Sequence, residues 1–155
     1  VSYSLMDRHI VDDLLPTASE LGVNIVAFGA LLSGLFGGRT QYEKLLPISK
    51  RVSSSTLENI TGNLSVADSL KEIADRKEIT LAQLAIAWVL AQGEDIMTLV
   101  GSRTPAQVES TIKALDATLS KEDLLEIEEI IPKKQANSSY MLELNFNEKG
   151  LFIPK

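Results

Sequence analysis

Two short apolar segments, residues 23–28 and 96–100, limit the folds open to this chain of 155 residues. Both are nearly continuous in apolar character, which is typical of strands buried on both faces. Helical patterns alternate with them, and this alternation favours parallel βαβ packing in the α/β class. A parallel sheet needs neighbouring strands and helices on both faces, so two strands cannot form a stable one alone. The sequence therefore predicts a partial sheet whose remaining strands come from elsewhere.

Capping and stop residues mark the predicted helices. They are expected at 11–21, from Ser65 to 77, at 81–92, at 105–115 and from Ser120 to 131. Pro16 either kinks the first helix or delays the start of its main part. Residues 39–63 show no convincing period and are expected to form a long connection. We expect one domain over residues 1–132, followed by an irregular tail over 133–155.

Composition excludes several classes of function. No run of 18 apolar residues occurs, which excludes a membrane span, and the net charge of −6 argues against nucleic acid as a partner. The absence of cysteine excludes disulfides and thiolate ligands and is compatible with a reducing, cytoplasmic location. With a single histidine, no metal site is predicted. The acidic cluster at Glu122–Asp123 and 126–129 is expected to be a solvated helix face.

The segment after the second strand has the pattern of an anion site. Thr104 is a good N-cap, Pro105 suits the first helical position, and Gln107 has the spacing of a capping box. A helix N-terminus offers free backbone N–H groups to an anion such as a phosphate, and Arg103 adds a permanent positive charge. These residues alone are equally compatible with an ordinary connection that binds no ligand.

Two groups of residues, taken in order, resemble the C-terminal part of an aldo-keto reductase. The first runs from Tyr3-Ser4-Leu5-Met6-Asp7-Arg8 through Glu20-Leu21-Gly22-Val23 to Val26-Ala27-Phe28 and Gly34-Leu35. The second is Gly101-Ser102-Arg103-Thr104-Pro105-Ala106-Gln107-Val108-Glu109, followed by Leu119-Ser120 and Glu122-Asp123-Leu124. The resemblance implies the C-terminal portion of a (β/α)8 TIM barrel that reduces carbonyls with NADPH at the C-terminal mouth. It places Tyr3 at the end of the sixth strand and makes 23–28 the seventh and 96–100 the eighth.

The resemblance also implies which residues bind the cofactor. Phe28 takes the position of a tyrosine that stacks on the nicotinamide, and its ring preserves the flat apolar face. Gly29, Leu31 and Ser33 match the loop along the pyrophosphate. Gly101, Ser102, Arg103 and Gln107 match the segment around the adenosine 2′-phosphate, which Ser102 and Arg103 are expected to meet. The sequence departs from the family pattern at Gly29 (often serine), at Leu32 (often glycine) and at Ser110-Thr111 (usually Glu-Asn).

Catalytic residues are not assigned in this chain. The family's aspartate, tyrosine, lysine and histidine belong to the first half of the barrel, and none of them can be located here. His9 is expected at the surface or in a cap, Asp7 and Arg8 in a structural ion pair or cap, and Trp88 in the core. The expected partners are the missing N-terminal portion of the barrel and a small carbonyl substrate. The alternative is a non-catalytic half-barrel that self-associates, or an NADPH-sensing module that binds a partner.

Overall fold

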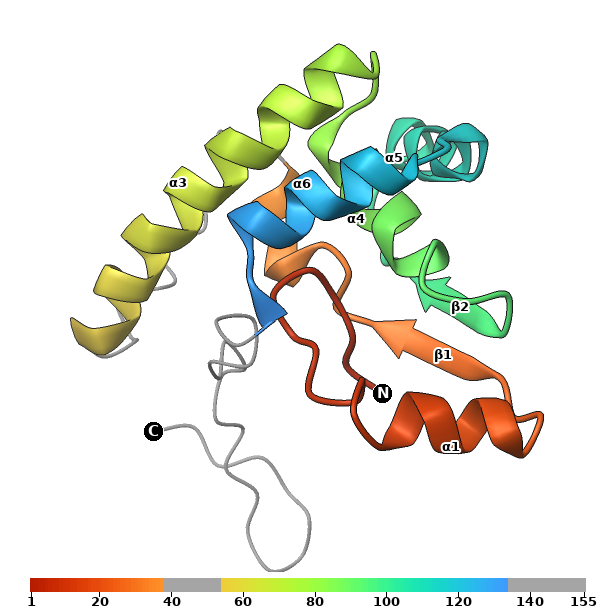
Figure 1. The fold of residues 1–155 in the computed structure, drawn as a ribbon. Helices are drawn as coiled ribbons and strands as arrows, with labels where there is room; N and C mark the ends of the chain where they lie inside the picture. The colour runs from red at the N-terminus through yellow and green to blue at the C-terminus, as the bar shows by residue number, and fades with distance from the viewer. Residues whose placement is uncertain (38–53, 134–155) are drawn as a thin grey trace, which may run out of the picture.

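The computed structural model describes residues 1–37 and 54–133 (Figure 1). Its elements run in the order α1 (Leu14–Glu20), β1 (Ile25–Phe28), η1 (Leu32–Gly37), α3 (Ser54–Arg76), α4 (Leu81–Leu90), β2 (Ile96–Leu99), α5 (Pro105–Ile112), η2 (Lys113–Asp116) and α6 (Lys121–Ile130). The two η elements are 3₁₀ helices. α4 packs against β2, and α3 packs against both α4 and α6. No helix in these two ranges is long and apolar enough to cross a membrane.

The two predicted strands are confirmed, and they are parallel neighbours. Ile25 lies opposite Ile96, and Phe28 lies opposite Leu99. On the other side of β1, the Tyr3 amide donates to the Phe28 carbonyl (3.1 Å), and the Phe28 amide donates to the Val1 carbonyl (2.9 Å). Residues 1–3 therefore run parallel to β1, and the order across the sheet is residues 1–3, β1, β2.

The prediction that both strands are buried on both faces is wrong for this chain. Ile25 and Ala27 of β1 and Ile96 of β2 face the helices and are buried. The opposite face is apolar but open, and its side chains are between 43 and 65% exposed: Val26, Phe28, Met97 and Leu99. We call these four residues the open sheet face. It stays open because the helices that bury the strands cover only one side of the sheet.

Local capping signals set most helix boundaries as predicted. The Thr80–Gln83 box opens α4, with the Gln83 amide 3.2 Å from the Thr80 hydroxyl and the Thr80 amide 2.8 Å from the Gln83 side chain. Ser120 and Asp123 form the same reciprocal pair at the start of α6. α1 begins at Leu14, so Pro16 lies in its first turn, where a missing N–H costs little.

The N-terminal boundary of α3 differs from the prediction. The helix begins at Ser54, whereas the sequence pattern placed its cap at Ser65 and a connection up to residue 63. Leu70, Ile73 and Ala74 are fully buried and anchor the C-terminal part of this helix. Extending a helix that has already formed costs much less than nucleating one, so poorly helical residues can be added to its N-terminal end. Residues 39–53 of the expected connection, and the tail from 134 on, lie outside the described residues.

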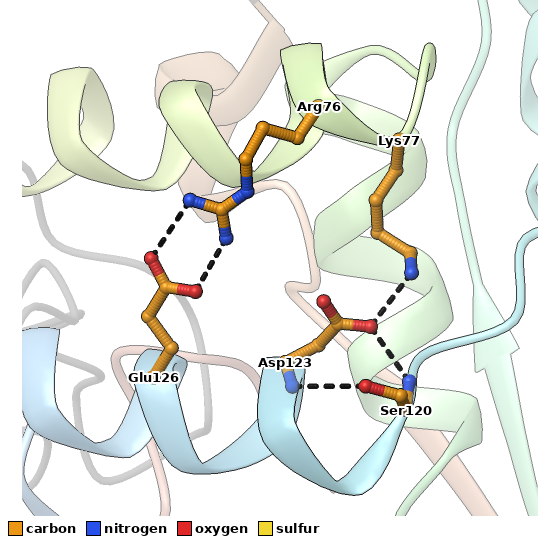
Figure 2. Close-up of polar contacts among 5 residues, drawn as sticks. All are labelled: Arg76, Lys77, Ser120, Asp123 and Glu126. Carbon is orange, nitrogen blue, oxygen red and sulfur yellow. Dashed lines mark hydrogen bonds and ion pairs between the residues drawn. The ribbon is translucent and has the colours of Figure 1, made fainter.

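Part of the acidic cluster is solvated, as predicted, since Glu122 and Glu129 are exposed, but three of its carboxylates form ion pairs that were not predicted. Figure 2 shows Lys77 donating to Asp123 (2.6 Å). It also shows the two terminal guanidinium nitrogens of Arg76 donating to the two carboxylate oxygens of Glu126. Burial raises the pKa of the Asp123 carboxyl, but the hydrogen bonds from Lys77 and Ser120 outweigh it and hold the pKa below its usual value. These contacts fasten α6 to the end of α3.

Trp88 lies in the core, as predicted. Its ring lies 5.5 Å from that of Tyr3, centroid to centroid, and the Arg8 guanidinium lies 4.5 Å from its centroid. Arg8 also donates to the Leu5 carbonyl (3.0 Å) and pairs with Glu128 of α6. Arg8 is therefore in a structural ion pair, as expected, and it fixes the N-terminal segment to α4 and α6.

Candidate functional site

The turn between β2 and α5 is built by its own side chains. The Thr104 hydroxyl accepts from the Gln107 amide (3.3 Å), and Pro105 is the first helical residue. The Gln107 side chain accepts from the Arg103 amide (2.7 Å), whereas a capping box would have used the Thr104 amide. Half of the predicted box is therefore wrong, because the Gln107 carboxamide closes the turn one residue earlier. This contact holds the backbone of Arg103 and leaves its side chain exposed.

An open depression of about 490 Å³ lies at this helix start, and its lining residues come from the turn and from the first two turns of α5: Ser102, Arg103, Thr104, Pro105, Val108 and Glu109. Ser102 and Arg103, which the resemblance assigns to the 2′-phosphate, are both among these lining residues. Gly101 and Gln107 are not among the lining residues. Sequence reasoning missed Val108 and Glu109, although their spacing from Pro105 places them on the same side of the helix.

The charge of the depression is set by one guanidinium and one carboxylate. Within residues 1–37 and 54–133, no acidic side chain forms an ion pair with Arg103. Its positive charge is therefore available to a ligand, but the helix start offers few free amides: Pro105 has no N–H, and the Gln107 and Val108 amides both donate to Thr104. An exposed guanidinium is suited to a phosphate monoester, whereas the Glu109 carboxylate in the same lining opposes an anion.

The loop after β1 supplies the second set of predicted residues. Phe28 is half-exposed on the open sheet face, so one side of its ring is accessible to a planar ligand. Gly29 has φ +87°, a conformation that favours glycine and turns the chain away from the strand. Leu31 packs partly against the core, and its carbonyl accepts from the Gly34 amide (2.9 Å). The side chain of Ser33 lies outside the described residues.

Leu32 occupies a strained backbone position. Its φ is +45°, in the left-handed region, and it stands where the resembling family often has glycine. The side chain packs partly against the core, which helps to hold this conformation. Leu32 therefore adopts the backbone conformation that glycine would adopt at this position, and its side chain adds a contact with the core.

The two loops leave the sheet at the same end. Phe28 and Leu99 are the last residues of neighbouring parallel strands and lie opposite each other. The segments that begin at Gly29 and at Gly101 therefore start side by side, at the carboxyl edge where ligands of α/β proteins bind. The structure thus brings together the two groups of residues that the sequence placed in one cofactor site.

Two titratable groups near the N-terminus have structural roles. The Tyr3 ring is buried, and burial raises the pKa of its hydroxyl to about 12. His9 is exposed at the surface, as expected, and its Nδ1 contacts Asp7, which also accepts from the Ser2 hydroxyl (2.6 Å). Neither group lies on the open sheet face.

Comparison with known proteins gives one consistent family. Residues 1–132 match the sequence profile of the aldo/keto reductase family. A probable aldo-keto reductase 1 from Glycine max is 34% identical in an alignment of 135 residues, which covers 85% of this chain and 39% of that protein.

Solved structures agree with this match. An aldo-keto reductase from Klebsiella pneumoniae, crystallised with NADPH, is 25% identical, with a TM-score of 0.61 over 89% of this chain and 40% of its own length. A thermostable aldo-keto reductase crystallised with the inhibitor epalrestat shares the fold, with 22% identity and a TM-score of 0.61 over 84% of this chain and 38% of its own. The chain thus spans about two fifths of the length of each relative. It belongs to the aldo-keto reductase family, whose fold is a (β/α)8 barrel.

Proposed function

We propose that this chain is the NADPH-binding C-terminal portion of an aldo-keto reductase, which reduces carbonyls when joined to the N-terminal part of the barrel. The observation that carries the proposal is the pairing of Phe28 with Leu99, which starts both predicted cofactor loops at one edge of the sheet. Family membership and the NADPH complex of the Klebsiella relative support the choice of cofactor.

The sheet supports the assignment to the last three strands. Residues 1–3, β1 and β2 are parallel and adjacent in chain order, as consecutive barrel strands are. The open sheet face is apolar, as the interior of a barrel must be. In this assignment the open face of the chain is the inner surface of the barrel, and the remaining strands come from the N-terminal portion.

The nicotinamide end of the cofactor belongs beside Phe28. NADPH supplies a hydride to the carbonyl carbon, and the substrate oxygen takes a proton. The accessible side of the Phe28 ring orients the nicotinamide by stacking, and the backbone after Gly29 follows the pyrophosphate. The proton donor is assigned to the N-terminal portion, where the family resemblance places the catalytic tyrosine; the Tyr3 hydroxyl is unsuited to the role, because it is buried and its pKa is about 12.

The adenosine end belongs in the depression at the start of α5. Arg103 and Ser102 line it, and a guanidinium and a hydroxyl are suited to the 2′-phosphate. Gln107 acts through the turn, since its carboxamide holds the Arg103 amide. NADH lacks the 2′-phosphate, so this end of the site favours NADPH.

Titration of the chain with NADPH, followed by nucleotide fluorescence, tests the proposal. Phe28→Ala should weaken binding, because it removes the stacking surface, whereas Phe28→Tyr keeps the ring and should bind as well as the parent chain. Far-ultraviolet circular dichroism checks that each variant is folded. Unchanged affinity in a folded Phe28→Ala variant would show that Phe28 is not part of the cofactor site.

A second candidate function is a non-catalytic half-barrel that self-associates. The open sheet face favours it, because exposed apolar strands with free edges tend to pair with other chains. Sedimentation across a concentration series separates the two candidates. A defined dimer that is lost in Val26→Lys, and that does not bind NADPH, would support the second and contradict the first.

A further inference from the structure

Ser2, Asp7 and His9 form a hydrogen-bonded chain that neither the core nor the proposed site uses. The Ser2 hydroxyl donates to Asp7 Oδ2 (2.6 Å), and the other carboxylate oxygen of Asp7 contacts His9 Nδ1. Exposure increases along this chain, from the buried Ser2 through Asp7, whose side chain is 17% exposed, to His9 at 57%. The chain therefore leads from inside the protein to its surface.

The inner end of this chain lies beside the predicted cofactor loop. Ser2 is paired with Phe28 across the sheet, so their side chains project from the same face. Tyr3, the next residue, projects from the other face and is buried in the core. A Cβ atom on Gly29 would lie 3.6 Å from the Ser2 hydroxyl oxygen. The hydroxyl that is bonded to Asp7 is therefore next to the residues assigned to the nicotinamide end of the site.

The position of Asp7 is fixed by its backbone. Its amide donates to the Ser4 carbonyl (3.2 Å) and to the Ser4 hydroxyl (3.1 Å), and its carbonyl accepts from the Ser4 amide (2.9 Å). Ser4 itself is buried. These contacts close a tight turn, and the hydrogen bond from Ser2 then orients the carboxylate. The carboxylate is thus preorganised and needs no rearrangement to act on a ligand beside it.

The negative charge of Asp7 is left open to a ligand. Among the residues that the structure describes, no lysine or arginine forms an ion pair with it. The neighbouring Arg8 is directed elsewhere, because its guanidinium lies over Trp88 and pairs with Glu128. The imidazole of His9 contacts Asp7 from the solvent side. A fixed negative charge therefore lies at the carboxyl edge of the sheet, close to the start of the cofactor loop.

We propose that the Asp7 carboxylate strengthens the binding of NADP⁺ relative to that of NADPH. The inference rests on the proposed function and deepens it, because it names the residue that distinguishes the two states of the coenzyme. The nicotinamide ring is neutral in NADPH and carries a positive charge once the hydride has left. A fixed negative charge near the ring attracts this cation. It also favours hydride transfer, during which the positive charge develops.

The test compares the two coenzymes on the full 155-residue chain by calorimetric titration. Both carry the same 2′-phosphate, so the contribution of Arg103 cancels in the ratio of their dissociation constants. Asp7→Asn removes the charge and keeps an oxygen that can accept from the Ser2 hydroxyl. Asp12→Asn is the matched control, because it removes the same charge from a side chain of the same segment that is 74% exposed. Far-ultraviolet circular dichroism checks that each variant is folded.

His9→Lys is a second variant, at a side chain that is mostly exposed. It places a permanent positive charge against Asp7 and removes neither the carboxylate nor its hydrogen bond from Ser2. It should therefore weaken the binding of NADP⁺ relative to NADPH, as Asp7→Asn does. His9→Gln is its uncharged control. This pair decides the question if Asp7→Asn does not fold.

We expect Asp7→Asn to weaken the binding of NADP⁺ roughly fivefold and to leave the affinity for NADPH nearly unchanged. Asp12→Asn and His9→Gln should leave the ratio as it is in the parent chain. An equal loss for both coenzymes on Asp7→Asn would overturn the inference, and so would an equal change of the ratio on Asp12→Asn. A parent chain that binds neither coenzyme would overturn the proposed function. A parent chain that binds both, with a ratio that no variant changes, would overturn only the role of Asp7.

Discussion

Arg103→Ala tests the adenosine end of the site. The backbone of Arg103 is held by Gln107, and its side chain is exposed and has no ion-pair partner in the described part of the chain. Removing one charge-assisted hydrogen bond from an exposed site costs about 1.5–3 kcal/mol. Since about 1.4 kcal/mol corresponds to a tenfold change, affinity for a 2′-phosphorylated nucleotide should fall roughly 10- to 150-fold. Salt should reduce the effect, because the charges are open to solvent.

Calorimetric titration of the chain with adenosine 2′,5′-bisphosphate and with adenosine 5′-phosphate measures this loss. The two ligands and two proteins form a double-mutant cycle, whose coupling energy isolates the contact between Arg103 and the 2′-phosphate. Arg76→Ala changes the net charge equally but lies at the pair with Glu126, and so controls for long-range electrostatics. Equal losses for both ligands on Arg103→Ala would refute the assignment of the 2′-phosphate to Arg103.

Three further predictions concern stability and are checked by chemical or thermal unfolding. Glu78 follows the C-terminus of α3 with φ +56°, in the left-handed region that favours glycine, so Glu78→Gly should raise the free energy of unfolding by about 0.5–1 kcal/mol. A lower free energy of unfolding would show that the Glu78 backbone is not strained. At Leu32, with φ +45°, the glycine variant should be about 1 kcal/mol more stable than the alanine variant, the reverse of the usual order. The lowered pKa of Asp123 contributes stability that is present above its unfolded pKa of about 3.9 and is lost as pH falls through the lower folded pKa. Asp123→Asn should therefore make the free energy of unfolding depend less on pH below about pH 4. If this dependence is unchanged in the variant, the Asp123 carboxylate is not its source.

Features set by neighbouring residues could be predicted from the sequence. The caps at Thr80, Thr104 and Ser120 depend on hydrogen bonds within three residues, and all three form. The strands at 25–28 and 96–99 follow from short apolar runs between helices. Family resemblance then placed two separated loops in one site, and the parallel register brings their starting points together.

Features that depend on distant parts of the chain could not be predicted in the same way. The cation partners of Glu126 and Glu128 come from α3 and from the N-terminal segment, so the ion pairs within the acidic cluster could not be predicted from its own residues. The early start of α3 was missed, although Leu57, Ile60 and Leu64 recur at helical spacing in the sequence. The open sheet face was not predicted, because the apolar composition of the two strands indicates burial on both faces, whereas the described helices cover only one.

The central claim is that this chain supplies the cofactor site and the N-terminal portion supplies the proton donor. NADPH oxidation in the presence of an aldehyde tests it most directly, measured for the 155-residue chain alone and for the chain joined behind the N-terminal portion of the Glycine max relative. We predict no aldehyde-dependent oxidation by the chain alone and turnover by the joined protein that falls on Phe28→Ala. Aldehyde-dependent turnover by the chain alone, as a well-behaved monomer, would contradict the claim.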